Sequence, residues 1–146
     1  MTRVKTARVL LVLFAAIVLF SCSKPPSNPE ATVIEDAVEI NIASLIPEVP
    51  SYFTYTYKDR KINYIVIMVD GKVQSYFDAC ETCHPKKLGF RYEDGYLYCR
   101  ACSEKYSVKD LETGHGNCYP VKLHGDRVGD KYIIAINSLI ENIRLF

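Results

Sequence analysis

The chain has 146 residues, enough for one domain and a tail. Its 18 Lys and Arg residues nearly balance its 17 Asp and Glu residues, and no basic stripe is visible. This balance argues against a protein that binds nucleic acid by neutralising many phosphates. Six cysteines, 11 tyrosines, many Val and Ile residues and no Trp indicate instead a small β-rich domain in which cysteine chemistry matters.

The N-terminal end of the sequence predicts export. Three basic residues precede an apolar run from Val9 to Phe20, which is too short for the roughly 20 residues that span a bilayer. Ser21 and Cys22 follow this run, and residues 19–22 resemble the cleavage site of a bacterial lipoprotein. We therefore expect residues 1–22 to be a lipoprotein signal peptide and Cys22 to attach the chain to the extracytoplasmic face of the cell membrane. Simple secretion and an uncleaved anchor are the alternatives.

Residues 23–36 predict a linker between the lipid and a folded domain. They are polar and contain three prolines, a composition that favours extended chain over a packed core. Such a tether holds the domain about 40 Å from the lipid surface, a distance that suits an integral-membrane partner. Residues 37–146 are expected to form the domain itself.

From Ala37 onward, apolar and polar residues alternate with the two-residue period of β-strands. Asp70-Gly71 and Glu93-Asp94-Gly95 each stand between two such runs, and an Asp-Gly pair supplies the positive φ angles of a tight hairpin turn. Residues 138–143 predict a short C-terminal helix capped by Asn137 or Ser138. The predicted fold is therefore mainly β and built of hairpins, with strands at 38–42, 52–57, 62–69, 72–77, 90–92, 96–98 and 132–136.

Two C-x-x-C pairs carry the strongest chemical signal in the chain. Cys80-Glu-Thr-Cys83 and Cys99-Arg-Ala-Cys102 are separated by 15 residues, within the spacing of a four-cysteine metal site. A tight turn aims both thiols of a pair at one ion, and the hairpin between the pairs brings the two turns face to face. We predict that these two loops bind a metal. Two disulfides are the alternative, because an exported protein meets an oxidising environment.

Cys118 is a fifth cysteine of the predicted domain, within the run Gly116-Asn117-Cys118-Tyr119-Pro120. A four-cysteine site leaves it unassigned, so it is a candidate fifth or replacement metal ligand, a redox partner or a buried thiol in a loop. Gly114 and Gly116 permit close approach of the backbone, which makes this segment a candidate lid over the site.

His84 directly follows Cys83, so residues 80–84 also fit the C-x-x-C-H pattern of covalent haem attachment. In that arrangement the two thiols take the haem vinyl groups, and His84 is an axial iron ligand. A haem, however, explains only two of the five cysteines of the domain. The plainer interpretations of His84 are an exposed loop residue or a hydrogen-bond donor to a metal-bound sulfur.

The cysteine motifs are part of a longer pattern: Phe77-Asp78-Ala79-Cys80-x-x-Cys83, Gly89-Phe90-Arg91, Tyr98-Cys99-x-x-Cys102, Tyr106 and Gly116-Asn117-Cys118-Tyr119-Pro120. Together, these residues resemble the FtrD-like membrane iron-sulfur-containing domain over roughly residues 38–146. The resemblance implies iron–sulfur binding, association with bacterial iron-uptake systems and a role in electron transfer. The order of elements is also similar to that of a Rieske domain, with cysteine in place of histidine, so a small Rieske-like fold is expected.

The leading hypothesis is an electron carrier with an iron–sulfur cluster or iron, serving an integral-membrane redox or metal-transport partner. No Ser/His/Asp arrangement, phosphate-binding glycine loop or paired carboxylate points to a catalyst. The sequence has no twin-arginine pair, so we expect export in the unfolded state, which suits a single Zn, Fe or Cu ion inserted outside the inner membrane. The alternatives are a zinc-stabilised interaction module, a c-type haem protein and a thiol–disulfide oxidoreductase.

Overall fold

A computed structural model of the chain describes residues 28–113 and 116–146. This part of the protein is mainly β, with three antiparallel sheets and a short helix near the C-terminus, which confirms the predicted fold class. The predicted signal peptide and Cys22 lie outside the described residues. Within those residues, no helix is long and apolar enough to cross a membrane. The Rieske-like arrangement stays a prediction.

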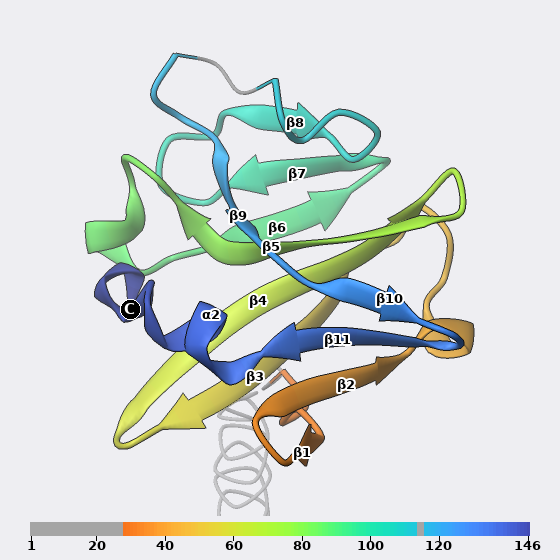
Figure 1. Cartoon of the computed structure of the whole chain (residues 1–146). Coiled ribbons are helices and arrows are strands. Elements are labelled where there is room, and N and C mark those ends of the chain that lie inside the picture. The colour runs from red at the N-terminus through yellow and green to blue at the C-terminus, as the bar shows by residue number, and fades with distance from the viewer. Residues whose placement is uncertain (1–27, 114–115) are drawn as a thin grey trace, which may run out of the picture.

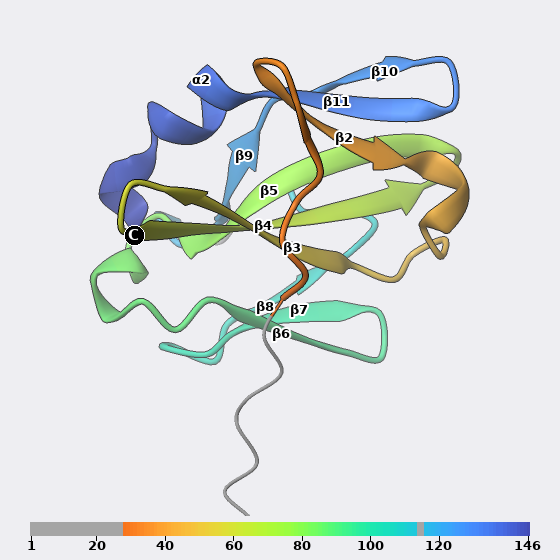
Figure 2. The same ribbon diagram turned by 90° about the horizontal axis from the view of Figure 1, so that it is seen from below.

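The three sheets lie in layers, with one sheet between the other two (Figures 1 and 2). The middle sheet has the strand order β3-β4-β5-β9 and consists of β3 (Ser51–Tyr57), β4 (Arg60–Val69), β5 (Lys72–Cys80) and β9 (Pro120–Leu123). One outer sheet has the order β1-β2-β11-β10 and consists of β1 (Val33–Ile34), β2 (Ala37–Asn41), β10 (Asp126–Val128) and β11 (Lys131–Ala135). The other has the order β6-β7-β8 and consists of β6 (Phe90–Glu93), β7 (Tyr96–Cys99) and β8 (Lys105–Ser107).

Strand β4 is buried on both faces, because the middle sheet packs against both outer sheets. Ile62, Tyr64 and Val66 join the core shared with β2 and β11, whereas Ile65 and Ile67 join the core shared with β6, β7 and β8. Burial on both faces explains why the sequence of β4 is an almost continuous apolar run. Among the described residues, the first core contains no cysteine, whereas the second contains Cys80 and Cys99.

Both predicted Asp-Gly hairpins are present. Asp70 and Gly71 have φ values of 49° and 74°, and Asp94 and Gly95 have φ values of 48° and 81°. Two consecutive positive φ angles fit the tight turns that match the twist of the flanking strands. The second hairpin places Cys99 at the end of β7, directly opposite Phe90 of β6.

The C-terminal helix begins earlier than predicted. Helix α2 (Ile136–Ile140) has Ala135 as its N-cap, so the prediction of Asn137 or Ser138 as the cap is wrong. The N–H of Ile136 donates to the carbonyl of Asp36, which satisfies one of the free donors at the helix start without a polar cap. Short 3-10 helices at η1 (Ile42–Ser44) and η3 (Ile143–Leu145) complete the structure together with η2 (His84–Lys86).

The part of the predicted linker that the structure describes pairs with the β domain. Val33 and Ile34 form β1 against β2, and Glu30 forms a bridge with Thr54 of β3. Three strands after the cysteine loops, β8, β9 and β10, were not predicted from the sequence. Of these, β9 matters most for the site, because it continues from the segment that carries Cys118.

Candidate metal centre

The first cysteine loop follows from the way β5 ends. Cys80 is the last residue of β5 and faces the core shared with the β6-β7-β8 sheet, where its exposed fraction is 3%. The chain then turns through Cys83 into η2, and the N–H of Lys86 donates to the carbonyl of Cys83 at 3.0 Å. The turn directs both thiols of the first pair toward the same space.

The second cysteine loop is a tight turn that aims backbone N–H groups at sulfur. The N–H of Ser103 donates to the carbonyl of Cys99 at 2.8 Å, which closes the turn. Burial raises the pKa of the Cys99 thiol, against the effect of the backbone N–H groups of Ala101 and Cys102, which donate to its sulfur. Such hydrogen bonds to sulfur stabilise thiolates and tune a bound metal.

Cys102 has the only lowered pKa among the cysteines whose shift is resolved in the described part of the chain. Burial acts to raise the pKa of the Cys102 thiol, but the N–H of Glu104 and the neighbouring thiols of Cys99, Cys83 and Cys118 outweigh it. Cys102 is also the exposed cysteine of the site. Thiolate is the form that binds metals, and the lowered pKa favours that form at Cys102 relative to an ordinary cysteine.

Cys118 comes from a segment distant in sequence, and this segment packs on the first cysteine loop. The hydroxyl of Thr82 donates to the carbonyl of Asn117 at 2.7 Å, and the N–H of Glu81 donates to the carbonyl of Tyr119 at 3.1 Å. Burial raises the pKa of the Cys118 thiol, although its hydrogen bond with the Thr82 side chain acts in the opposite direction. The structure therefore brings all five described cysteines into one place, which sequence spacing had left open for Cys118.

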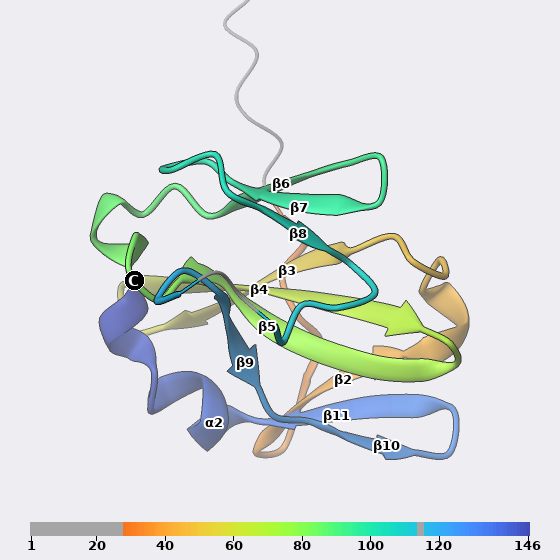
Figure 3. The same ribbon diagram turned by 90° about the horizontal axis from the view of Figure 1, so that it is seen from above.

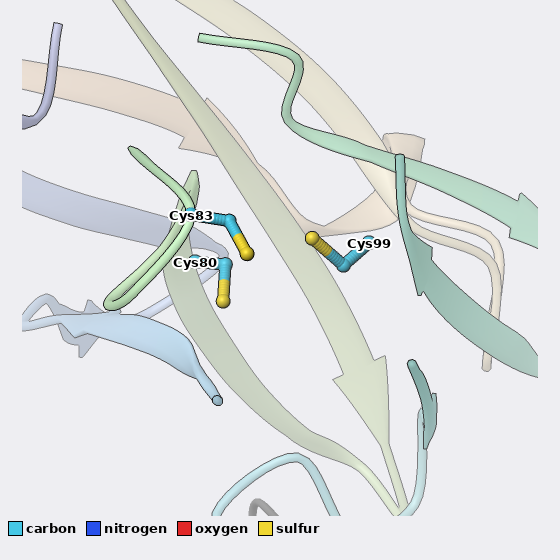
Figure 4. Close-up of side chains that lie close together, drawn as sticks. All are labelled: Cys80, Cys83 and Cys99. Atoms are coloured by element: carbon cyan, nitrogen blue, oxygen red, sulfur yellow. The ribbon is translucent and has the colours of Figure 1, made fainter. Parts of the chain in front are cut away.

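The five sulfurs form two overlapping triads. The Sγ atoms of Cys80, Cys83 and Cys99 all lie within 4.8 Å of one another, and those of Cys83, Cys102 and Cys118 do so as well. Figure 4 shows the first triad, with Cys80 and Cys83 facing Cys99 from the opposite ligand loop. The first triad is mostly buried and the second is open to solvent. All five described cysteines are free thiols, not the disulfides that the sequence left as an alternative.

Asp78 holds the two cysteine loops together, a role that sequence reasoning missed. Its Oδ1 accepts a hydrogen bond from the N–H of Phe90 at 2.6 Å, and Arg100 bonds the carbonyls of Gly89 and Phe90, each at 3.0 Å. Residues 89–90 are thereby hydrogen-bonded both to Asp78, which precedes the first cysteine loop, and to Arg100 of the second cysteine loop. Burial raises the pKa of Asp78 to about 6, against the lowering effects of the Phe90 N–H and the Arg100 charge.

A cavity of about 190 Å³ lies against the buried triad. It is bordered by Cys80, Cys83 and Cys99, together with His84 and the C-terminal Phe146. In Figures 1 and 3 the C-terminus lies beside the first cysteine loop. His84 joins neither triad, and its Nδ1 lies 2.7 Å from the carbonyl oxygen of Glu81. The structure therefore places His84 at the cavity wall.

A layered β fold with cysteines converging from three loops defines a class of cysteine-rich domain suited to holding metal. A family model described as "Membrane iron-sulfur containing protein FtrD-like" matches residues 47–146, and the chain belongs to this family. The predicted family resemblance is thus confirmed. A search of curated proteins and a search of solved structures found no match to the chain.

The residues of the site fit the iron–sulfur group that the family description names. Iron–sulfur clusters are held by cysteine thiolates, and five thiols are gathered here. Backbone N–H groups already donate to two of the sulfurs, and the cavity beside the buried triad offers room for inorganic atoms. The donor set suits soft or iron-containing groups in general, since thiolates also bind zinc and copper(I).

Proposed function

We propose that this protein is an exported, lipid-anchored iron–sulfur protein that transfers electrons to a membrane metal-uptake or redox system. The observation that carries the proposal is the convergence of Cys80, Cys83, Cys99, Cys102 and Cys118 into two sulfur triads. Each of these cysteines is proposed as a metal ligand. The family description, which names both a membrane and an iron–sulfur group, supports the same assignment.

The spacing of the sulfurs favours a centre with more than one metal atom. A single tetrahedral ion with metal–sulfur bonds of about 2.3 Å requires four sulfurs about 3.8 Å apart. The described cysteines form triads within 4.8 Å, but no set of four meets that limit. The spacing therefore supports a centre with more than one metal atom over a single zinc ion that only stabilises the fold, and the family description points to iron and sulfide as its atoms.

The unequal burial of the ligands supports electron transfer. Cys80 and Cys99 are 3% and 2% exposed, so one side of the centre is sealed within the core. Cys102, on the other side, is exposed, and a partner protein can approach the centre there. Bound iron would supply one-electron chemistry, and the cysteine thiolates would hold it while backbone N–H groups donate hydrogen bonds to two of the sulfurs.

The proposed location follows from the N-terminal sequence. A lipid attached to Cys22 and a proline-containing linker would hold the β domain near the extracytoplasmic side of the membrane. This placement suits an integral-membrane redox or metal-transport protein as the electron partner. The family description supports association with a membrane but names no partner.

The test is an absorption and electron paramagnetic resonance spectrum of the full chain, purified in detergent without oxygen and measured with and without dithionite. Iron and acid-labile sulfide in the protein, with visible bands that bleach on reduction, support the proposal. A colourless protein with bound zinc would overturn electron transfer and favour a zinc-stabilised interaction module. A Soret band would instead assign Cys80, Cys83 and His84 to covalent haem.

A further inference from the structure

The two sulfur triads share one atom, the Sγ of Cys83. The inner triad adds Cys80 and Cys99, and the outer triad adds Cys102 and Cys118. Cys83 therefore lies within 4.8 Å of each of the other four sulfurs. We propose that, without inorganic sulfide, the five cysteines bind two soft divalent ions, one in each triad, with the Cys83 thiolate as the bridge between them.

This inference rests on the proposed role of the same cysteines as metal ligands and goes beyond it in the number of ions and the role of Cys83. A thiolate sulfur has enough lone pairs to bind two metal ions at once, so one cysteine can serve both triads. Each triad then supplies three of the four ligands of a four-coordinate ion. The cavity bordered by Cys80, Cys83 and Cys99 has room for a water molecule, which would serve as a fourth ligand of an ion in the inner triad.

In each triad, one sulfur that is not shared with the other triad accepts hydrogen bonds from the backbone. The sulfur of Cys99 accepts bonds from the N–H groups of Ala101 and Cys102, and the sulfur of Cys102 accepts one from the N–H of Glu104. Cys99 belongs to the inner triad alone and Cys102 to the outer triad alone. Each triad therefore has its own thiol oriented by the backbone, and Cys83 is the one cysteine that belongs to both triads.

Charge balance is consistent with a shared thiolate. Each thiol that binds a metal loses its proton to the solvent as the metal–sulfur bond forms. Two divalent ions held by five thiolates leave one negative charge, whereas two triads that share no thiolate would leave two. The smaller charge matters because Cys80 and Cys99 are buried, and uncompensated charge is costly in the core.

The two triads differ in accessibility, which predicts an order of filling and release. The outer triad contains exposed Cys102, whereas two of the three inner sulfurs belong to buried residues. A chelator in solution therefore reaches the outer ion first. The inner ion would be held by buried Cys80 and Cys99, so its release is expected to be slower and chelation to show two kinetic phases.

The test uses the full chain in detergent, freed of metal, kept reduced with a phosphine and titrated with ¹¹³Cd(II). Native mass spectrometry counts the ions, and ¹¹³Cd NMR detects a shared sulfur as splitting between two cadmium signals. We expect two ions per chain and two mutually split signals. One ion per chain, or two signals without splitting, would overturn the inference.

Two matched variants assign the bridge. Cys102→Ser removes a thiol from the outer triad alone at an exposed position, so the inner signal is expected to persist without splitting. Cys83→Ser takes a ligand from both triads, so both ions are expected to bind more weakly and the splitting to vanish. Splitting that survives in Cys83→Ser would assign the bridge to another thiol and overturn the inference.

The same measurements separate this inference from the proposed function. Iron and sulfide in the protein as purified, together with one cadmium ion in the metal-free protein, would overturn the thiolate bridge and leave the iron–sulfur proposal standing. No bound cadmium at all would count against the cysteines as metal ligands and therefore against both proposals.

Discussion

At the scale of single residues, the site depends on a glycine that lets a carboxylate approach the backbone. A Cβ at residue 89 would lie 2.5 Å from the Oδ2 of Asp78, and Gly89 has a φ of +64°. The close approach allows Asp78 to accept the hydrogen bond from Phe90 that links the two cysteine loops. Gly71 also has a positive φ, of +74°, but nothing lies within 4 Å of its Cβ position.

Replacing these two glycines separates backbone strain from steric conflict. We expect Gly71→Ala to lower the free energy of unfolding by about 1–2 kcal/mol, the cost of a left-handed conformation for a residue with a Cβ. Gly89→Ala is expected to cost about 1–3 kcal/mol more, because Asp78 must also move and give up a buried hydrogen bond. Urea denaturation measures both losses. Equal losses for the two variants would contradict the role assigned to Asp78.

A buried tyrosine hydroxyl gives a second prediction. Tyr64 is fully buried and stacks on Phe53 with ring centroids 5.6 Å apart, and its Oη has no hydrogen-bond partner in the described structure. Because burying an unpaired hydroxyl is costly, Tyr64→Phe is expected to raise the free energy of unfolding by about 1 kcal/mol. Tyr132→Phe is the control and is expected to lower it, because the Tyr132 hydroxyl is hydrogen-bonded to that of Ser75.

The same tyrosine makes stability depend on alkaline pH. Burial, followed by the charge of Glu30, raises the pKa of Tyr64 above its ordinary value. The unfolded chain therefore releases this proton from about pH 10 upward while the native state retains it, so stability falls as the pH rises above that value. Tyr64→Phe is expected to reduce this slope. Denaturation midpoints of both proteins between pH 9 and pH 11 measure this slope. An unchanged slope in Tyr64→Phe would contradict the contribution of Tyr64 to the pH dependence.

At the scale of elements, the loop between β8 and β9 determines whether the site has four thiols or five. Its last described residues pack on the first cysteine loop through Thr82 and Glu81, and this places Cys118 in the outer triad. Strand β9 then pairs with β5, with Pro120 opposite Cys80. The residues before and after Cys118 are therefore both hydrogen-bonded to the first cysteine loop.

Thr82→Val tests how the segment that carries Cys118 packs on the first cysteine loop, because valine conserves the shape of the threonine side chain but lacks its hydroxyl. Removing the hydroxyl breaks its hydrogen bond to the Asn117 carbonyl and is expected to weaken the neighbouring bond from the Glu81 N–H to Tyr119. The exchange of the Glu81 amide hydrogen should then accelerate about fivefold, equivalent to about 1 kcal/mol. Thr56→Val, whose hydroxyl contacts Glu30, is the control and should leave that exchange rate unchanged.

At the scale of the whole molecule, the three layers create two cores that differ in their content of cysteine. Within the described part of the chain, the core between the middle sheet and the β1-β2-β11-β10 sheet contains no cysteine, whereas the other core contains Cys80 and Cys99. The candidate metal centre is thus part of the packing between the middle sheet and the β6-β7-β8 sheet. Metal removal is therefore expected to loosen that hairpin sheet before the rest of the domain, as a faster exchange of its amide hydrogens.

The proposed membrane attachment gives a prediction for the protein in cells. Cys22→Ala removes the thiol that would carry the lipid, so the protein is expected to leave the membrane fraction. Cell fractionation and the mass of the N-terminal peptide check this expectation. Cys118→Ala, which alters a cysteine of the β domain, should leave the membrane attachment unchanged. Persistence of Cys22→Ala in the membrane fraction would contradict the anchor.

The sequence by itself determined the local features of this protein. Asp70-Gly71 and Asp94-Gly95 specify their hairpins because the positive φ angles are preferences of those residues. Alternation of apolar residues, together with β-branched and aromatic runs, placed β2 to β7 and β11, and the cysteine motifs pointed to the family that the comparison confirmed. These features depend on neighbouring residues, whose preferences can be evaluated without the fold.

Only the tertiary structure decided how distant segments meet. Three features depend on contacts between segments that are separated in the chain: the place of Cys118 beside Cys83, the hydrogen bond from the Phe90 N–H to Asp78, and the start of α2 at Ile136, whose N–H donates to the carbonyl of Asp36. Two C-x-x-C pairs predicted four equivalent ligands, but the packing of three loops produced two triads around one shared sulfur. Sequence spacing records how far apart thiols lie along the chain, whereas packing between sheets sets their distances in space.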